Sequence, residues 1–228
     1  FPKAKANNKV SFSVRKKTIH AILGENGAGK STIVKILYGI LKSDDGKIIF
    51  KNEILNINSP AEARKLGIGM IFQHFSLFDS LSVRENLILG LDDYISYSKL
   101  EIKIEELTKK YNLKLNLDAP ITSLSSGEKQ RVEIIRVLLQ KPKILIMDEP
   151  TSVLTPLEVK NLFLTLNALV EDGTTILYIT HKLKEVISLC NTVTIMRNGK
   201  VIETSPIGKN TTKTLAKKML GHNLDDIT

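Results

Sequence analysis

A short segment near the N-terminus has the residue types and spacing that bind phosphate. Residues 24–32 read GENGAGKST, which fits the pattern G-x-x-x-x-G-K-[ST]. Glycines let the backbone curl so that successive N–H groups point into one concavity, and a following helix adds the positive end of its dipole. Lys30 would reach the β- and γ-phosphates of a nucleotide, and Ser31 would ligate Mg²⁺. The alternative is a glycine-rich turn that only happens to precede a helix.

Two adjacent acids follow an apolar run in the second half of the chain. Residues 144–147 read ILIM, which is typical of a strand buried on both faces, and Asp148 and Glu149 come next. An aspartate at that position can hold Mg²⁺, and a second acid beside it can polarise an attacking water. The alternative is a strand that simply ends in two charged residues exposed to solvent. The phosphate-binding segment earlier in the chain favours the functional interpretation over this alternative.

A third polar segment opens a predicted helix. Residues 124–131 read LSSGEKQR, and serine and glycine at a helix N-terminus form another anion cradle. Read in isolation, Ser125 or Ser126 would be the N-cap, and Glu128 would complete a capping box.

The elements that must position these residues alternate between strands and helices. Strands are predicted over 9–14, 20–23, 47–50, 69–72, 144–147 and 175–179, with helices at 33–38 and from Ser59-Pro60 onward. Strands at 193–196 and 200–203 flank Arg197-Asn198-Gly199, a hairpin signal. Residues 79–140 show helical spacing instead. The sequence predicts one α/β domain, with a core of about 1–78 and 141–228 and an inserted helical subdomain of about 79–140.

Composition is that of an ordinary globular domain. The chain has 228 residues, of which 42% are hydrophobic and 25% charged, and it contains no apolar run long enough to span a bilayer. A single cysteine, Cys190, excludes an internal disulfide and a cysteine-based zinc cluster, and it is expected in the core. The net charge of +9 permits a polyanionic partner, but the lysines are scattered, which favours a solvated lysine-rich surface.

The order of these segments resembles the ATP-binding cassette (ABC) family over essentially the whole chain. Residues 24–31 match its Walker A motif, and 124–128 resemble its LSGGQ signature. The single positions that match the family are Gln73 for the Q-loop, Asp148 and Glu149 for Walker B and the catalytic glutamate, His181 for the switch histidine, and Phe1 for the aromatic that stacks on adenine. The fold implied is a P-loop NTPase core with a mixed sheet, an antiparallel β edge and an inserted helical subdomain.

The resemblance also implies roles for these residues toward ATP and Mg²⁺. Nucleotide binding would fall to Phe1, Gly24, Asn26, Gly27, Ala28, Gly29, Lys30, Ser31 and Thr32. Ser31, Gln73 and Asp148 would hold Mg²⁺, and Glu149, His181 and Gln73 would be the catalytic residues. In this family two cassettes sandwich two ATP molecules head to tail, so Ser125, Ser126 and Gly127 would complete the site of a second cassette.

Two positions of the signature depart from the family pattern. Ser126 stands where the motif has its first glycine, and Glu128 stands where it has glutamine. A side chain at Ser126 could crowd a phosphate, and Glu128 adds negative charge unless it turns away into a capping box. Thr155 replaces the aspartate that most cassettes carry after Walker B.

A closer resemblance is to the ATPases of simple-sugar and nucleoside importers. It is carried by residues 66–75 (LGIGMIFQHF), 148–156 (DEPTSVLTP) and 180–186 (THKLKEV). In that subfamily two cassettes are fused, and the present chain is expected to be the first. The implied partners are the second cassette, transmembrane permease subunits and, indirectly, an extracytoplasmic solute-binding protein, with no nucleic acid. The implied location is peripheral, on the cytoplasmic face of the cell membrane.

Two other functions remain open at this point. The first is a non-transport ABC ATPase that acts on nucleic acid or the ribosome, which the net charge permits. The second is a module that senses nucleotide without turnover, and Glu149 argues against it because such a module would lack the catalytic acid. The transported solute is not encoded in these motifs.

Overall fold

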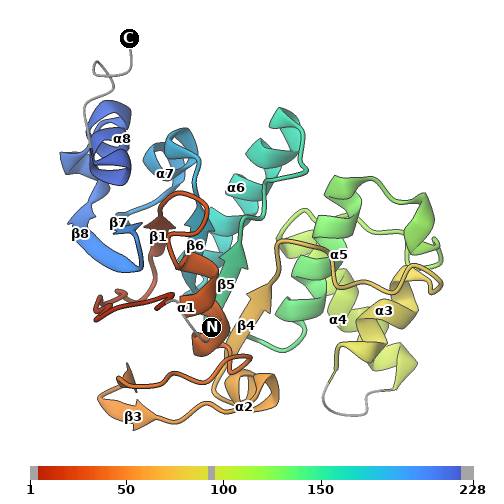
Figure 1. Ribbon diagram of the computed structural model, residues 1–228. Helices are drawn as coiled ribbons and strands as arrows, with labels where there is room; N and C mark the ends of the chain where they lie inside the picture. The colour runs from red at the N-terminus through yellow and green to blue at the C-terminus, as the bar shows by residue number, and fades with distance from the viewer. Residues whose placement is uncertain (1–4, 92–95, 222–228) are drawn as a thin grey trace.

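A six-stranded sheet forms the centre of the molecule (Figure 1). The computed structural model describes residues 5–91 and 96–221, so the predicted adenine-stacking Phe1 lies outside the described residues. The sheet order is β4 (Ile68–Ile71), β5 (Ile144–Asp148), β6 (Thr175–Thr180), β1 (Ile19–Leu23), β7 (Thr192–Arg197) and β8 (Lys200–Pro206). All pairings are parallel except β7–β8, and β2 (Ile48–Phe50) with β3 (Glu53–Leu55) forms a separate antiparallel hairpin. The predicted mixed α/β fold with an antiparallel edge is confirmed.

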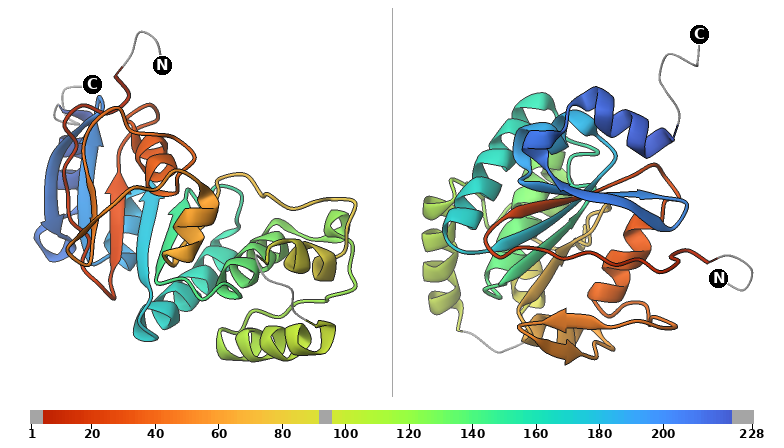
Figure 2. Two further views of the ribbon diagram at one scale, coloured as in Figure 1. Left: turned by 90° about the horizontal axis from the view of Figure 1, so that it is seen from below. Right: turned by 90° about the vertical axis from the view of Figure 1, so that its left-hand side faces the viewer.

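Helices cover both faces of the sheet (Figure 2). One face carries α1 (Lys30–Leu37) and α2 (Pro60–Lys65), and the other carries α5 (Ser126–Leu138), α6 (Pro156–Glu171), α7 (Leu183–Leu189) and α8 (Thr212–Leu220). Strand β5 contributes to the hydrophobic cores on both faces of the sheet. Leu145 and Met147 pack on the face that carries α5 to α8, while Ile146 between them packs against α1, because successive side chains of a strand alternate between faces. The predicted central strands are therefore apolar on both faces.

The helical block lies to one side of the sheet (Figure 2, left). It contains α3 (Val83–Leu89), α4 (Tyr97–Lys110), a 3₁₀ turn at Ile121–Ser123 and α5; a second 3₁₀ turn, Ile207–Lys209, precedes α8. Helix α5 also packs on β4, since a Cβ at Gly69 would touch Val137. The helical content predicted for this region is present, and the exact subdomain boundaries stay a prediction.

One predicted strand is wrong and one predicted hairpin is confirmed. Residues 9–14 form no strand. Val10, Phe12 and Val14 do pack against the core around α1, so their alternation reflects packing of an extended segment rather than pairing in a sheet. At the other end, Asn198 and Gly199 have φ angles of 48° and 72°, as the tight turn between β7 and β8 requires.

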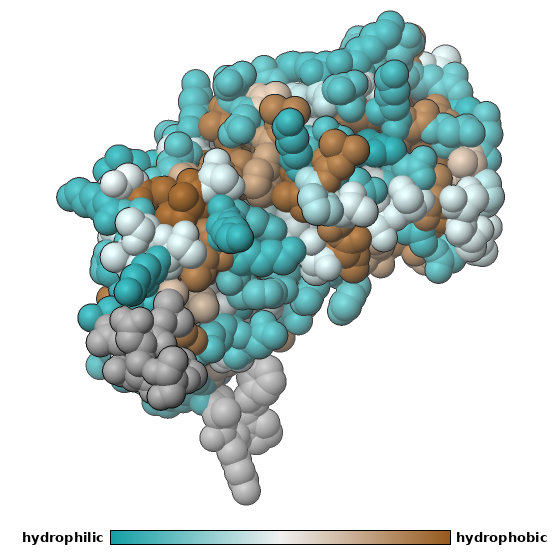
Figure 3. Space-filling model, turned by 90° about the horizontal axis from the view of Figure 1, so that it is seen from above, coloured by the Kyte–Doolittle hydropathy of each residue, from teal (hydrophilic) through white to brown (hydrophobic). Residues whose placement is uncertain are grey.

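The hydrophilic surface and the burial of the single cysteine are those expected from the composition. Hydrophilic side chains cover most of the face seen in Figure 3, with hydrophobic ones interspersed. Among residues 5–91 and 96–221, no helix has the length and apolar character needed to cross a membrane. Cys190 is buried, as predicted, and desolvation by burial raises the pKa of its thiol.

Candidate functional site

The phosphate-binding segment is the turn between β1 and α1, which is the local context its sequence predicts. Gly29 is the N-cap of α1 with a φ of 95°. A Cβ there would collide with the Ala6 carbonyl and the Asn7 amide, so both the backbone angle and the space select glycine. The Asn7 amide also donates to the Gly29 carbonyl oxygen at 3.1 Å. Ala6 and Asn7 of the N-terminal segment thus pack against the outside of the loop and stabilise it.

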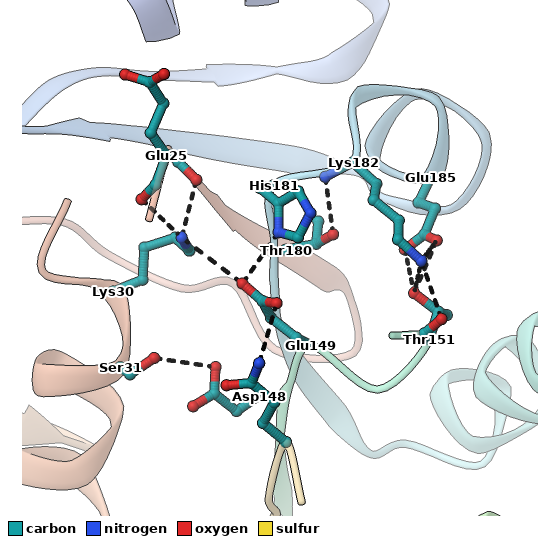
Figure 4. Close-up of polar contacts among 12 residues, drawn as sticks. Glu25, Lys30, Ser31, Asp148, Glu149, Thr151, Thr180, His181, Lys182 and Glu185 are labelled. Atoms are coloured by element: carbon teal, nitrogen blue, oxygen red, sulfur yellow. Dashed lines mark hydrogen bonds and ion pairs between the residues drawn. The ribbon is translucent and has the colours of Figure 1, made fainter. Parts of the chain in front are cut away.

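Lys30 lies inside this loop (Figure 4). Its side chain is only 5% exposed, and Nζ donates to the carbonyl oxygens of Gly24 at 2.8 Å and Glu25 at 3.0 Å. Burial lowers the pKa of Lys30, while the charges of Glu149, Asp148 and Glu25 oppose that shift. A positively charged ammonium held in place within a loop is well suited to bind a phosphate anion.

Ser31 and Asp148 face each other across the site, from α1 and from the end of β5. Ser31 Oγ donates to Asp148 Oδ1 at 3.3 Å, and Asp148 is 4% exposed. Desolvation raises the pKa of the Asp148 carboxyl, although the Ser31 hydrogen bond and nearby lysines oppose it. A hydroxyl and a carboxylate oxygen are ligands that Mg²⁺ accepts, and a divalent cation would offset the cost of this buried charge. The residues present therefore fit Mg²⁺.

Nearby acids and histidines alone would not make a metal centre. In the described part of the chain, no group of three or more histidine, cysteine, aspartate or glutamate side chains could hold a metal ion. A magnesium ion at Ser31 and Asp148 would consequently need further oxygens from water or nucleotide, as is usual for this ion.

Glu149 is held in an unusual backbone conformation beside Asp148. Its φ is +48°, a left-handed value that costs a non-glycine residue about 1–2 kcal/mol. Its N–H donates to the Ile179 carbonyl oxygen at 2.9 Å, which ties it to β6. Strained residues of this kind persist where the surrounding structure holds them, and they concentrate at functional sites.

The Glu149 side chain collects contacts from three other elements (Figure 4). Oε1 lies 3.1 Å from His181 Nδ1 and 3.9 Å from Lys30 Nζ, and Oε2 accepts from Gln73 Nε2 at 3.5 Å. Gln73 follows β4, Glu149 follows β5, and His181 follows β6. Ligands of open α/β sheets bind outside the carboxyl ends of the strands, and the structure brings these predicted residues together there.

The remaining predicted residues of the loop have distinct environments. Asn26 and Gly27 are exposed at its tip, and Thr32 is half-buried on α1. Ala28 is 5% exposed and packs in the core around α1, so its contribution to the loop is the backbone.

The signature segment begins α5, and here the structure resolves the choice between two caps. Ser125 is the N-cap: its Oγ accepts from the Glu128 N–H at 3.3 Å, and Glu128 Oε2 accepts from the Ser125 N–H at 2.9 Å. Ser126 is instead the first residue of the helix, so the reading of Ser126 as the structural cap is wrong. Glu128 is engaged in the capping box, and hydrogen bonds from the backbone and the hydroxyl of Ser125 lower its pKa.

Gly127 faces the start of α6. A Cβ on Gly127 would collide with the carboxylate of Glu158, which forms a capping box with Thr155. Hydrogen bonds from Thr155, and then from the Gly127 backbone, lower the pKa of Glu158. Among the described residues, no hydrogen bond or ion pair joins 125–127 to the loop at 24–32. The described part of the chain therefore does not link its two predicted anion-binding segments by a hydrogen bond or ion pair.

Sequence reasoning missed a buried polar cluster behind Glu149 and His181. Thr151, Tyr178, Lys182 and Glu185 share hydrogen bonds there. Three of these residues lie inside motifs quoted above, but a sequence pattern does not indicate which of their side chains turn inward. Glu158 was missed as well, although Thr155-x-x-Glu158 is a capping-box pattern that could have suggested it.

Known proteins are similar to this chain in sequence and structure. A family model described as "ABC transporter" matches residues 7–152. The nucleoside import ATP-binding protein NupA of Lactococcus lactis is 43% identical over 228 residues, and the glucose import ATP-binding protein TsgD13 of Haloferax volcanii is 37% identical over 256 residues. Each match covers 98% of this chain but only 45% and 46% of the relative, so the chain spans about half the length of these proteins.

A solved structure of an ATP-binding cassette is also similar to this chain. The ADP conformation of MJ1267, an ATP-binding cassette of an ABC transporter, superposes with a TM-score of 0.87 at 29% identity and covers 97% of this chain and 93% of that one. With the family model matching more than half of the sequence, this chain belongs to the ABC transporter family.

Proposed function

We propose that this chain is an ATP-binding and ATP-hydrolysing cassette that powers import of a small solute, a simple sugar or a nucleoside, through a membrane permease. One observation carries this proposal. At the carboxyl ends of the parallel strands, the structure brings together the side chains of Lys30, Ser31, Asp148, Glu149 and His181. The import ATP-binding proteins among its relatives support the choice of solute class.

The roles of the residues follow from their placement. Lys30 and the N–H groups of the loop bind the β- and γ-phosphates, and Ser31 and Asp148 hold Mg²⁺ with Gln73 beside them. Mg²⁺, when bound, supplies positive charge to the phosphate oxygens. Glu149 orients and deprotonates the attacking water, and His181, whose Nδ1 lies 3.1 Å from Glu149 Oε1, contacts the γ-phosphate. Catalysis then consists mostly of positioning and charge neutralisation.

A second cassette completes the site in this proposal. In the described part of the chain no hydrogen bond or ion pair joins the signature residues Ser125, Ser126 and Gly127 to the chain's own loop, and in this proposal they serve the site of a partner. That partner is the second half of a longer polypeptide of which this chain is the first cassette. The proportion of the relatives that the chain spans supports this arrangement.

The helical block between Gln73 and Leu124 contacts the permease in this proposal. Phe78 and Leu89, in this region, have side chains that are 58% and 59% exposed. Such side chains suit contact with a transmembrane partner at the cytoplasmic face of the membrane. An extracytoplasmic solute-binding protein would act through the permease and would not touch this chain.

The test is substrate-stimulated ATP hydrolysis by the complete protein assembled with its permease and solute-binding protein in vesicles. Nucleosides or simple sugars should raise the ATPase rate and drive their own uptake. Stimulation by RNA or ribosomes, with no response to any solute, would overturn the proposal in favour of a non-transport ABC ATPase.

A further inference from the structure

A largely buried polar cluster lies next to the two residues proposed for catalysis, and the proposed function gives it no role. Its members are Thr151, Tyr178, Lys182 and Glu185, which we call the 151/185 clamp. Thr151 and Glu185 are 2% and 9% exposed, and Tyr178 is fully buried. A buried carboxylate at such a position is costly unless several donors satisfy it.

Hydrogen bonds and an ion pair join the members of the clamp, and Figure 4 shows those among Thr151, Lys182 and Glu185. The Thr151 hydroxyl donates to Glu185 at 2.8 Å, and the Tyr178 hydroxyl donates to the same carboxylate at 2.7 Å. Lys182 Nζ donates to the Thr151 carbonyl at 2.9 Å and to its hydroxyl at 3.0 Å, and it lies 3.3 Å from Glu185 Oε1. Each hydroxyl or carboxylate therefore has a partner within the cluster.

The sequence positions of these residues link two loops. Thr151 lies two residues after Glu149, and Lys182 comes directly after His181. The Ser152 N–H also donates to the Glu149 carbonyl at 3.2 Å, which closes a turn on the strained Glu149. A left-handed glutamate needs such surroundings to stay in place.

We propose that the 151/185 clamp positions Glu149 against His181 by fixing the 149–152 turn to the loop that carries the histidine. Its members are positioning residues, because their hydrogen bonds run to one another and they act through Glu149 and His181. This inference rests on the proposed catalytic roles of those two residues, and it adds the residues on which their geometry depends.

The test compares substitutions that differ by a single group, in the complete protein assembled with its permease. Thr151→Val keeps the shape and removes the hydroxyl, whereas Thr151→Ser keeps the hydroxyl. Thr151→Val should lower kcat about tenfold and leave the KM for ATP within about twofold, because the loop at 24–32 is untouched. Thr151→Ser should retain kcat within about twofold.

A second substitution guards against a folding defect at the buried threonine. Lys182 is 39% exposed, so Lys182→Met should fold, and it should also lower kcat without raising KM. Its matched control is Lys184→Met, because Lys184 is an exposed lysine on α7, two residues after Lys182 and outside the clamp, and this variant should leave kcat unchanged. Equal activity of Thr151→Val and Thr151→Ser, or equal activity of the two lysine variants, would overturn the inference.

Hydrogen exchange separates this inference from the proposed function, since it requires no turnover. The amides of 149–152 should exchange faster in Thr151→Val than in Thr151→Ser. Unchanged protection in both variants would overturn the clamp even if the protein hydrolyses ATP. Absence of ATPase activity in the parent protein would overturn the proposed function, whatever the exchange rates show.

Discussion

The Nδ1 atom of His181 lies 3.1 Å from Oε1 of Glu149, a contact between the ends of two neighbouring strands. A carboxylate only accepts hydrogen bonds, so this contact is a hydrogen bond in the histidine tautomer that carries its proton on Nδ1. The contact fixes the orientation of the imidazole and directs Nε2 away from Glu149. Loss of either residue should therefore disturb the other, as expected of a base and the group that orients it.

Replacing Lys30 should remove most of the affinity for ATP. Lys30→Ala deletes the buried ammonium within the loop, and hydrogen bonds to charged groups contribute about 1.5–3 kcal/mol each, which corresponds to roughly 10–100-fold in binding. Titration calorimetry with MgATP measures the effect. The matched control is Lys35→Ala, since Lys35 is an exposed lysine on the same helix. An ATP affinity in Lys30→Ala equal to that of this control would remove the phosphate role.

Asp148→Asn should stabilise the protein in the absence of magnesium and abolish its response to magnesium. The pKa of Asp148 is raised by burial, so ionisation opposes folding: stability is highest below the unfolded pKa and falls as pH rises through the folded pKa. At neutral pH the asparagine relieves this cost, with a gain in Tm of about 2–4 °C for each kcal/mol. Thermal unfolding with and without MgATP gives both readouts. A lower Tm, or an undiminished magnesium effect, would contradict the account.

Substitutions of the two signature serines should have different effects on the free energy of unfolding. Ser125→Ala removes the N-cap of α5 and should cost about 1 kcal/mol, whereas Ser126→Ala leaves the capping box intact and should cost little. Urea denaturation distinguishes them. Ser126→Gly in the full-length protein then tests crowding at the partner site: a higher ATPase rate supports it, and equal rates would show that the serine is tolerated there.

Hydrolysis by the isolated chain should be slow and should depend on protein concentration. In the proposed arrangement each site needs a signature segment from another cassette, and among the described residues no hydrogen bond or ion pair joins Ser125–Gly127 to the chain's own loop. Steady-state ATPase activity should rise steeply when the proposed second cassette is added. A fast rate per molecule that does not change with dilution would mean that one cassette is sufficient.

The sequence predicted the parts of the fold that depend on local pattern. The β1–loop–α1 unit, the strand that ends in Asp148 and the hairpin at Asn198-Gly199 all rest on residues whose types impose one backbone geometry. The segment at 9–14 was misjudged because an alternating pattern reports which side chains are buried and does not say whether the backbone finds a partner strand.

The grouping of Lys30, Ser31, Asp148 and Glu149 could be predicted from the sequence, but the residues that support them could not. Lys30, Ser31, Asp148 and Glu149 carry their chemistry in the side-chain type. Thr151 and Glu185 become a pair only because β5 and β6 lie side by side and α7 turns back over them. Their separation of 34 residues leaves no local signal.

ATP turnover by Glu149→Gln in the complete protein tests the central claim most directly. The substitution keeps the shape of the side chain and removes the base, and general-base catalysis is worth about 10²–10⁴-fold. The account predicts that this variant binds MgATP as tightly as the parent protein and releases phosphate at least about a hundredfold more slowly. Phosphate release at the parent rate, with ATP binding intact, would show that Glu149 is not the catalytic base.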